Sequence, residues 1–136
     1  MKVIPELAGR FNGMAFRVPT PTVSVIDLVA EVDRDVTIDA VNAAFREAAK
    51  GSLRGILDVC DRPLVSMDFK GNPHSSIVDA LMTLVLKDRI VKVVAWYDNE
   101  WGYSCRMADL AAYVASQDLK RDQHRLWGVA KDTKSS

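Results

Sequence analysis

The chain has 136 residues, of which 49% are hydrophobic and 26% are charged, and its 18 basic residues balance 18 acidic ones. This length and composition indicate one globular domain with a core that needs neither a metal nor a disulfide. A formal charge of zero creates no long-range field that would attract nucleic acid or an anionic membrane. We therefore expect neither as a partner.

The sequence carries no sign of export or membrane insertion. Its longest mostly apolar stretch, Val91 to Tyr97, is interrupted by Lys92 and is far shorter than the roughly 20 residues of a membrane span. A proline and a glutamate lie within the first six residues, which argues against a secretory signal. Cys60 and Cys105 lie far apart and have no metal-ligand spacing. We expect a cytoplasmic protein with two reduced thiols.

The N-terminal third is predicted to be extended. Residues 1–13 contain Pro5 and two glycines and look like a frayed lead-in, the end of a helix whose start is absent. Residues 14–18 predict a strand, which Pro19-Thr20-Pro21 interrupts, and Val23 to Val29 resumes it. Because proline cannot donate a hydrogen bond to a sheet, the interruption predicts a bulge or a sheet edge.

The clearest predicted helix follows. Thr37 is a suitable N-cap, apolar residues recur at helical spacing from Ile38 to Ala48, and Gly51 supplies a stop.

The middle of the chain favours short strands. Residues 55–59 and 64–69 predict two strands, and residues 77–86 and 90–97 predict a strand pair joined by the polar turn 87–89. Residues 77–86 are also rich in good helix formers, so a helix there is the alternative.

A last amphipathic helix is predicted from apolar residues at spacings of four, three and four, namely Tyr103, Met107, Leu110 and Val114. We expect it to end near Gln117 and to cover one face of the sheet. Residues 118–136 are polar and predict a weakly ordered tail, so the domain is placed at residues 1–117. The fold class is α+β: a mixed, mostly antiparallel sheet with helices packed on one face.

Common catalytic motifs are missing from the sequence. It contains no G-x-G-x-x-G, phosphate-binding loop, nucleophile elbow or H-E-x-x-H. His74, Ser75 and Asp79 could form a hydrolase triad, but residues adjacent in sequence rarely adopt that geometry, so a loop histidine beside capping hydroxyls is favoured. Carboxylates near Cys60 oppose thiolate formation, and Cys105 is interpreted as a packing residue.

Two features exceed what a plain domain needs. Arg17 interrupts an apolar segment, where its guanidinium either binds a phosphate through two parallel hydrogen bonds or pairs on an exposed face. Trp96 to Tyr103 gathers four aromatic residues with carboxylate and amide groups at a predicted strand-to-helix junction. Such a junction can bind a ligand or can simply cap and pack the helix, and both interpretations stay open.

Three stretches, Gly13 to Pro21, His74 to Ala80 and Trp96 to Ser104, resemble signatures of one family in the same order and at similar spacing. They are similar to the C-terminal part of the catalytic domain of phosphorylating glyceraldehyde-3-phosphate dehydrogenase. The resemblance covers about Val3 to Gln117. Three separate matches make it specific.

The resemblance implies a glycolytic oxidoreductase that oxidises glyceraldehyde 3-phosphate with NAD or NADP and inorganic phosphate through a cysteine thioester. Arg17 matches an arginine that binds substrate or attacking phosphate. Asn99 matches the asparagine that holds the nicotinamide carboxamide, and Tyr103 matches a tyrosine lining that pocket, while Glu100 lies in the same motif. The resemblance also implies a mixed, largely antiparallel sheet and an oligomer, usually a tetramer.

The departures from the family are equally informative. The family's nucleotide-binding domain, active-site cysteine and catalytic histidine precede the matched part, and neither Cys60 nor Cys105 takes the nucleophile position. We therefore assign no catalytic residue and no metal site, and expect a truncated domain that is inactive alone and binds no cofactor stably. We expect it to form a homo-oligomer or to pair with another chain. The alternative function is a non-catalytic module for self-association or protein interaction.

Overall fold

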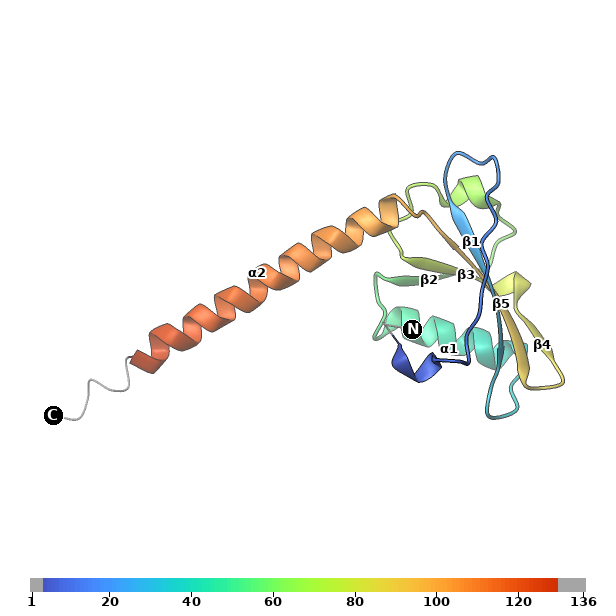
Figure 1. Cartoon of the computed structure of the whole chain (residues 1–136), viewed down its shortest axis with the longest axis horizontal. Helices are drawn as coiled ribbons and strands as arrows, with labels where there is room; N and C mark the ends of the chain where they lie inside the picture. Colours follow the sequence, from blue (N-terminus) through green and yellow to red (C-terminus); the bar gives the residue numbers. More distant parts are fainter. Residues whose placement is uncertain (1–3, 130–136) are drawn as a thin grey trace.

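The structure is a computed structural model that describes residues 4–129. It contains a five-stranded sheet, two α-helices and three short 3-10 turns (Figure 1). The strands are β1 (Ser24–Glu31), β2 (Leu57–Cys60), β3 (Ser76–Asp79), β4 (Leu84–Leu86) and β5 (Ile90–Tyr97). The helices are α1 (Ile38–Lys50) and α2 (Trp101–Val129), and the 3-10 turns are Pro5–Leu7, Ser66–Phe69 and Ala80–Met82.

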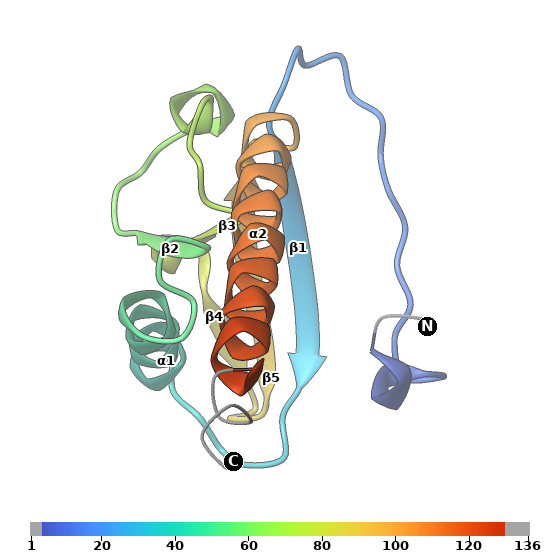
Figure 2. The same cartoon turned by 90° about the vertical axis from the view of Figure 1, so that its left-hand side faces the viewer.

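The sheet is mixed and mostly antiparallel, which confirms the predicted α+β class. The strand order is β1-β5-β3-β2, and β4 pairs with β5. β2 and β3 run parallel, whereas the pairs that involve β5 are antiparallel. β1 lies at the sheet edge (Figure 2). Its register pairs Ser24 with Tyr97, so the start of β1 lies beside the end of β5.

Helix α1 forms as predicted and packs on one face of the sheet. The Thr37 hydroxyl accepts a hydrogen bond from the Ala40 amide at 3.2 Å, and the helix ends at Gly51, whose N–H donates to carbonyls of the last turn. Its apolar side packs, through residues such as Val41 and Phe45, against a core cluster from three strands of the sheet: Leu57, Val78, Val91, Val93 and Ala95. Val85 of β4 is half-buried beside them. The apolar spacing of the sequence thus became the half-buried stripe by which α1 packs on the sheet.

A second core cluster joins Val23, Cys60, Phe69 and Ile77, with Leu64 and Trp96 packed against it. The strand predicted for residues 64–69 is wrong, because Ser66–Phe69 forms a 3-10 turn. The Asp68 carboxylate accepts a hydrogen bond from the Val65 amide at 2.9 Å, which closes the turn and stabilises it over the strand.

Residues 77–86 form neither the single strand nor the helix that the sequence allowed. The chain forms β3, the 3-10 turn Ala80–Met82 and then β4. The Asp79 carboxylate accepts a hydrogen bond from the Leu81 amide, so the chain turns directly after β3. The polar turn between β4 and β5 is confirmed, with Lys87 and Asp88 both in the left-handed region, as tight hairpins require.

The strand predicted at residues 14–18 is wrong. This segment is exposed and belongs to a long arch before β1 (Figure 1). Within the described part of the chain it has no sheet partner, because β1 pairs with β5 and the arch stays away from the free edge of β1 (Figure 2). Extended residues without a partner strand do not form a ladder.

Helix α2 also differs from expectation. It continues to Val129, past the predicted end at Gln117, so residues 118–129 are helical and not a weakly ordered tail, while residues 130–136 lie outside the described residues. It extends away from the sheet and does not cover it (Figure 1). Helix α1, and not α2, packs against the core cluster of the sheet. Among the described residues, neither helix is long and apolar enough to cross a membrane.

Candidate functional site at the β5–α2 corner

The corner where β5 gives way to α2 carries the exposed amide of Asn99. The start of β1 lies beside it, and the Ser24 hydroxyl donates a hydrogen bond to Asn99 Oδ1 at 3.2 Å. Because this bond engages the amide oxygen, the Nδ2 group is left as a donor toward solvent. The corner therefore presents a positioned hydrogen-bond donor.

Asp98, next to Asn99, has a structural role. Its carboxylate is 4% exposed and accepts hydrogen bonds from the amides of Gly71 at 2.8 Å, Trp101 at 2.9 Å and Glu100 at 3.0 Å. The hydrogen bond from Gly71, then those from Trp101 and Glu100 and the charge of Lys70, lower the pKa of Asp98 against the opposing effect of burial. Asp98 thus caps the N-terminus of α2 and links it to the loop before β3.

The aromatic part of the corner divides into two roles. Trp96 stacks on Phe69 with ring centroids 5.6 Å apart, and its indole N–H donates to Asp79 Oδ2 at 3.1 Å. These contacts are packing. Tyr103, in the first turns of α2, is 66% exposed and is free to contact a ligand. The sequence left ligand binding and packing open, and the structure assigns packing to Trp96 and capping to Asp98.

Arg17 lies on the exposed arch before β1. Among the described residues, no hydrogen bond or ion pair involves its guanidinium, and none joins it to Asn99 or Tyr103. Arg17, the residue predicted to bind phosphate, therefore has its donors available and makes no described hydrogen bond to the corner.

Val23 connects the arch to β1 in a strained conformation. It is buried and has a φ of 69°, in the left-handed region that β-branched residues avoid. Such strain persists only where surrounding contacts over-determine it. Here the core cluster around Val23 holds the residue, and the next residue, Ser24, is the one that bonds to Asn99.

Comparison with known proteins identifies the family of this chain. The family model described as "Glyceraldehyde 3-phosphate dehydrogenase, C-terminal domain" matches residues 1–99. The chain belongs to this family. The family resemblance seen in the three sequence signatures is thus confirmed, and the chain is a partial C-terminal domain of the glyceraldehyde-3-phosphate dehydrogenase type.

Individual relatives agree. The chain is 59% identical over 117 residues to glyceraldehyde-3-phosphate dehydrogenase of Geobacillus stearothermophilus, covering 86% of this chain and 35% of that protein. It is 56% identical over 115 residues to glyceraldehyde-3-phosphate dehydrogenase 2 of Bacillus subtilis, covering 85% and 34%. A chloroplastic glyceraldehyde-3-phosphate dehydrogenase of Arabidopsis thaliana is 56% identical over 114 residues, covering 84% and 29%. The chain spans about a third of the length of these dehydrogenases.

The hydrolase triad considered for His74, Ser75 and Asp79 is wrong. His74 Nδ1 bonds to Asn72 Oδ1 at 2.9 Å, whereas the Asp79 carboxylate is taken by Trp96 and Leu81. Asp79 is buried at the end of β3, while His74 and Ser75 lie in the loop before that strand, so the carboxylate cannot orient the imidazole.

The two cysteines are free and differ in burial. Cys60 is buried and its thiol donates to the Arg62 carbonyl at 3.4 Å, whereas Cys105 is half-buried on α2. In the part of the chain that the structure describes, no cluster of metal-ligating side chains occurs.

The sequence did not identify Arg106 as a structural residue. Its guanidinium donates to the carbonyls of Gly55 and Pro73 and to the Ser75 hydroxyl, and it pairs with Asp109 at 2.8 Å. It therefore fastens the second turn of α2 to two loops. Only the i,i+3 pair with Asp109 is visible in the sequence, because the other acceptors lie more than 30 positions away.

Proposed function

We propose that this chain supplies the C-terminal part of the catalytic domain of a glyceraldehyde-3-phosphate dehydrogenase, with Arg17 as a ligand for a phosphate group and with Asn99 and Tyr103 as contacts for the nicotinamide of NAD or NADP. The observation that carries the proposal is the family match over residues 1–99, which includes Arg17 and Asn99, together with 59% identity to a dehydrogenase over 117 residues.

The geometry of Asn99 supports its part. A nicotinamide carboxamide needs a hydrogen-bond donor for its oxygen, and the Ser24 hydroxyl leaves Asn99 Nδ2 in that role. Tyr103 follows one turn later in the chain and is exposed, so its ring can lie against a planar ligand.

Arg17 supports the phosphate part by its chemistry. A guanidinium fork matches two phosphate oxygens, and its exposure leaves all of its donors available. Because Arg17 lies on an arch that no strand pairs with, binding a phosphate would require ordering of the arch, which weakens affinity.

We further propose that these 136 residues alone do not turn over substrate. A thioester mechanism needs a reactive thiolate and a general base. Cys60 is buried in the core and its thiol donates to a backbone carbonyl, Cys105 is half-buried on α2, and among the described residues no hydrogen bond joins either thiol to His74.

The test separates binding from turnover. The isolated chain is incubated with glyceraldehyde 3-phosphate, inorganic phosphate and NAD, and then NADP, and formation of reduced cofactor is followed by absorbance. We expect no turnover, and we expect phosphate to perturb the amide resonances of the arch in the parent chain but not in Arg17→Gln. Turnover would overturn the proposed inactivity, and an unchanged phosphate response in the variant would overturn the role of Arg17.

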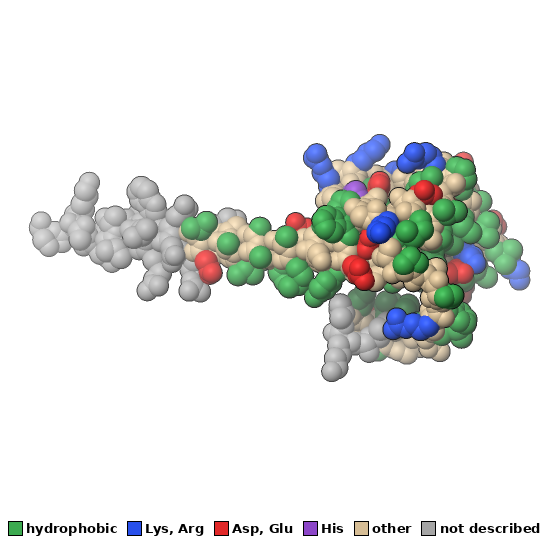
Figure 3. Space-filling model, turned by 90° about the horizontal axis from the view of Figure 1, so that it is seen from above, with side chains coloured by type: hydrophobic (Ala, Val, Ile, Leu, Met, Phe, Trp, Pro, Cys, Tyr) green, Lys and Arg blue, Asp and Glu red, His purple; other side chains and the backbone are tan. Residues whose placement is uncertain are grey.

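A second candidate function, self-association, is favoured by the exposed apolar surface. β1 is paired on one side only, and its apolar side chains on both faces are 42–62% exposed. Helix α2 exposes a further apolar series along its described length (Figure 3), namely Trp101, Tyr103, Met107, Leu110, Tyr113 and Val114. Unpaired edges and contiguous apolar surfaces are typical of interfaces.

Sedimentation equilibrium over a wide concentration range tests this second function. We expect a mass that rises with concentration, and we expect Val25→Lys on β1 or Tyr113→Glu on α2 to lower it. A mass equal to the monomer at every concentration would exclude self-association as the function.

A further inference from the structure

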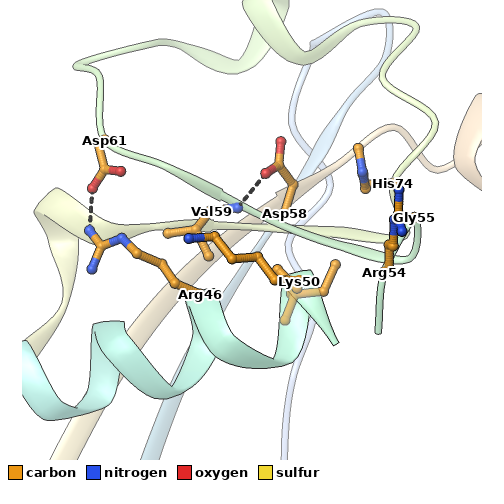
Figure 4. Close-up of a pocket in the computed structure, with 10 residues that line it drawn as sticks. Arg46, Lys50, Arg54, Gly55, Asp58, Val59, Asp61 and His74 are labelled. Carbon is orange, nitrogen blue, oxygen red and sulfur yellow. Dashed lines mark hydrogen bonds and ion pairs between the residues drawn. The ribbon is translucent and has the colours of Figure 1, made fainter. Parts of the chain in front are cut away.

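A hollow on the α1 side of the sheet lies apart from the corner. It has a volume of about 570 Å³ and is bounded by the last turns of α1, the turn before β2, β2 itself and His74 (Figure 4). A volume of this size is within the range that small ligands occupy. Neither Arg17 nor Asn99 nor Tyr103 lines it, so it is independent of the proposed dehydrogenase function.

Cationic side chains dominate the wall. Arg46 forms an ion pair with Asp61 at one end, Lys50 lies across the middle, and Arg54 lies at the other end with His74 (Figure 4). Within the described residues, no carboxylate pairs with Lys50 or Arg54. In the view from above, Lys and Arg side chains gather near a histidine on the same surface (Figure 3). Two cations are therefore available to a ligand.

The single carboxylate near the middle of the hollow is already engaged. Asp58 Oδ1 accepts a hydrogen bond from the Val59 amide at 2.8 Å, so part of its charge is balanced locally. The Arg46–Asp61 pair is neutral as a unit. The remaining charge of Lys50, Arg54 and Asp58 is positive, which favours an anion over a cation.

The imidazole of His74 leaves one nitrogen for this ligand. Asn72 Oδ1 accepts a hydrogen bond from the His74 backbone amide at 3.0 Å, which identifies this side-chain atom as oxygen. The same oxygen bonds to His74 Nδ1 at 2.9 Å, so Nδ1 carries the proton. Nε2 then accepts a hydrogen bond from a P–OH group when the ring is neutral, or donates one to a phosphate oxygen when the ring is protonated.

We propose that this hollow is a binding site for a phosphate group, held by Arg54 and His74 at one end and attracted by the charge of Lys50, whose ammonium lies toward the middle of the hollow (Figure 4). The guanidinium of Arg54 offers two parallel donors, Lys50 adds a point charge, and His74 Nε2 reads the remaining oxygen. Inorganic phosphate and the phosphate of a small monoester share this chemistry. A polynucleotide does not fit, because the hollow offers only two unpaired cations on a chain with no net charge.

The experiment uses the full chain carrying Arg17→Gln, so that binding at the arch does not contribute. The labelled protein is titrated with inorganic phosphate and, separately, with glycerol 3-phosphate, and the amide resonances of residues 54–59 and the ring resonances of His74 are followed by NMR. The test variant adds Lys50→Gln and Arg54→Gln, and the matched control adds Arg34→Gln, an exposed arginine in the β1–α1 connection that does not line the hollow.

We expect saturable shifts centred on these residues, and an affinity at least about tenfold lower in the double variant, because a charge-assisted hydrogen-bonding group and a second positive charge are lost. The control should bind like the parent. Tighter binding of glycerol 3-phosphate than of phosphate would identify a monoester as the ligand, and equal binding would identify the free anion. Shifts that do not saturate, or an equal loss in the control, would overturn the site. Lys50 and Arg54 are both exposed, so we expect the double variant to fold like the parent. Its spectrum without phosphate is the reference from which its shifts are measured.

Discussion

The two helices of this chain show how differently sequence-encoded amphipathicity can be used. Helix α1 is capped by Thr37, packs its half-buried apolar stripe on the sheet and buries its polar Asn42. Helix α2 is longer, at 29 residues, but its described contacts with the domain lie at its start, through the cap residue Asp98 before it and through Gly102 and Arg106 in its first two turns. An apolar stripe therefore indicates that a helix is able to pack against another element. It does not predict that the fold offers an apolar surface beside that helix.

This difference separates the two helices energetically. Changes in α1 act on the core and should affect the whole domain, whereas changes in α2 beyond its second turn should affect the helix alone. Four substitutions, ordered by expected effect, test that separation.

The largest effect is expected for Asn42→Ala in α1. Asn42 is 6% exposed, its Nδ2 donates to the Ala80 carbonyl at 3.0 Å and its Oδ1 accepts from the Thr83 hydroxyl at 2.7 Å. Removing it leaves two buried groups without partners, so we expect the free energy of unfolding to fall by about 2–3 kcal/mol in urea denaturation. Asn12→Ala, on the exposed arch, is the control. Equal loss in both would mean that the buried bonds contribute little.

The second effect is expected for Asp98→Asn at the start of α2, at about 1–2 kcal/mol near neutral pH. Because the pKa of Asp98 is lowered by folding, the ionised carboxylate stabilises the fold fully above its unfolded pKa of about 3.9, and this contribution is lost as pH falls through the lower folded value. The parent should thus lose more stability than the variant on acidification below about pH 4. Parallel pH profiles of the two chains would contradict this, with Asp35→Asn as a control.

The third effect concerns the cap of α1. Thr37→Ala removes the acceptor for the Ala40 amide and should lower the free energy of unfolding by about 1 kcal/mol. Thr37→Ser keeps the hydroxyl oxygen and should stay within about 0.5 kcal/mol of the parent. Chemical denaturation monitored by circular dichroism compares the three chains, and equal stability of Ala and Ser variants would show that the cap is dispensable.

The smallest effect is expected for Leu110→Ala on α2. Leu110 is 55% exposed, so its truncation should change the free energy of unfolding of the monomer by less than about 0.5 kcal/mol, when measured at a protein concentration that excludes association. A loss comparable to that of Asn42→Ala would show that α2 packs on the domain in solution.

The features that the sequence predicted correctly are those with local physical causes. The capped helix α1, the strand β5 and the polar hairpin turn each follow from neighbouring residues: a side-chain cap, an apolar run and residues that tolerate positive φ. The candidate site was predicted from three short signatures that resemble those of one family, and the roles of its residues stay predictions. Two of its members, Asn99 and Tyr103, are exposed, as a ligand contact requires.

What the sequence missed depends on distant partners. Residues 14–18 have strand-like composition but no strand to pair with, and residues 64–69 fold into a turn that delivers Phe69 to Trp96. The role of Arg106 depends on carbonyls that only the folded chain brings near. Likewise, the phosphate hollow joins α1 to the loop before β3, and no linear motif marks such a juxtaposition.

The outward course of α2 has a hydrodynamic consequence. A helix of 29 residues is roughly 40 Å long, at a rise of about 1.5 Å per residue. A compact chain of 136 residues would have a radius of gyration of about 14 Å. Small-angle scattering of the monomer should give a clearly larger radius of gyration. Rotational diffusion should be anisotropic, and rotation about the axes perpendicular to the helix axis should be slowest.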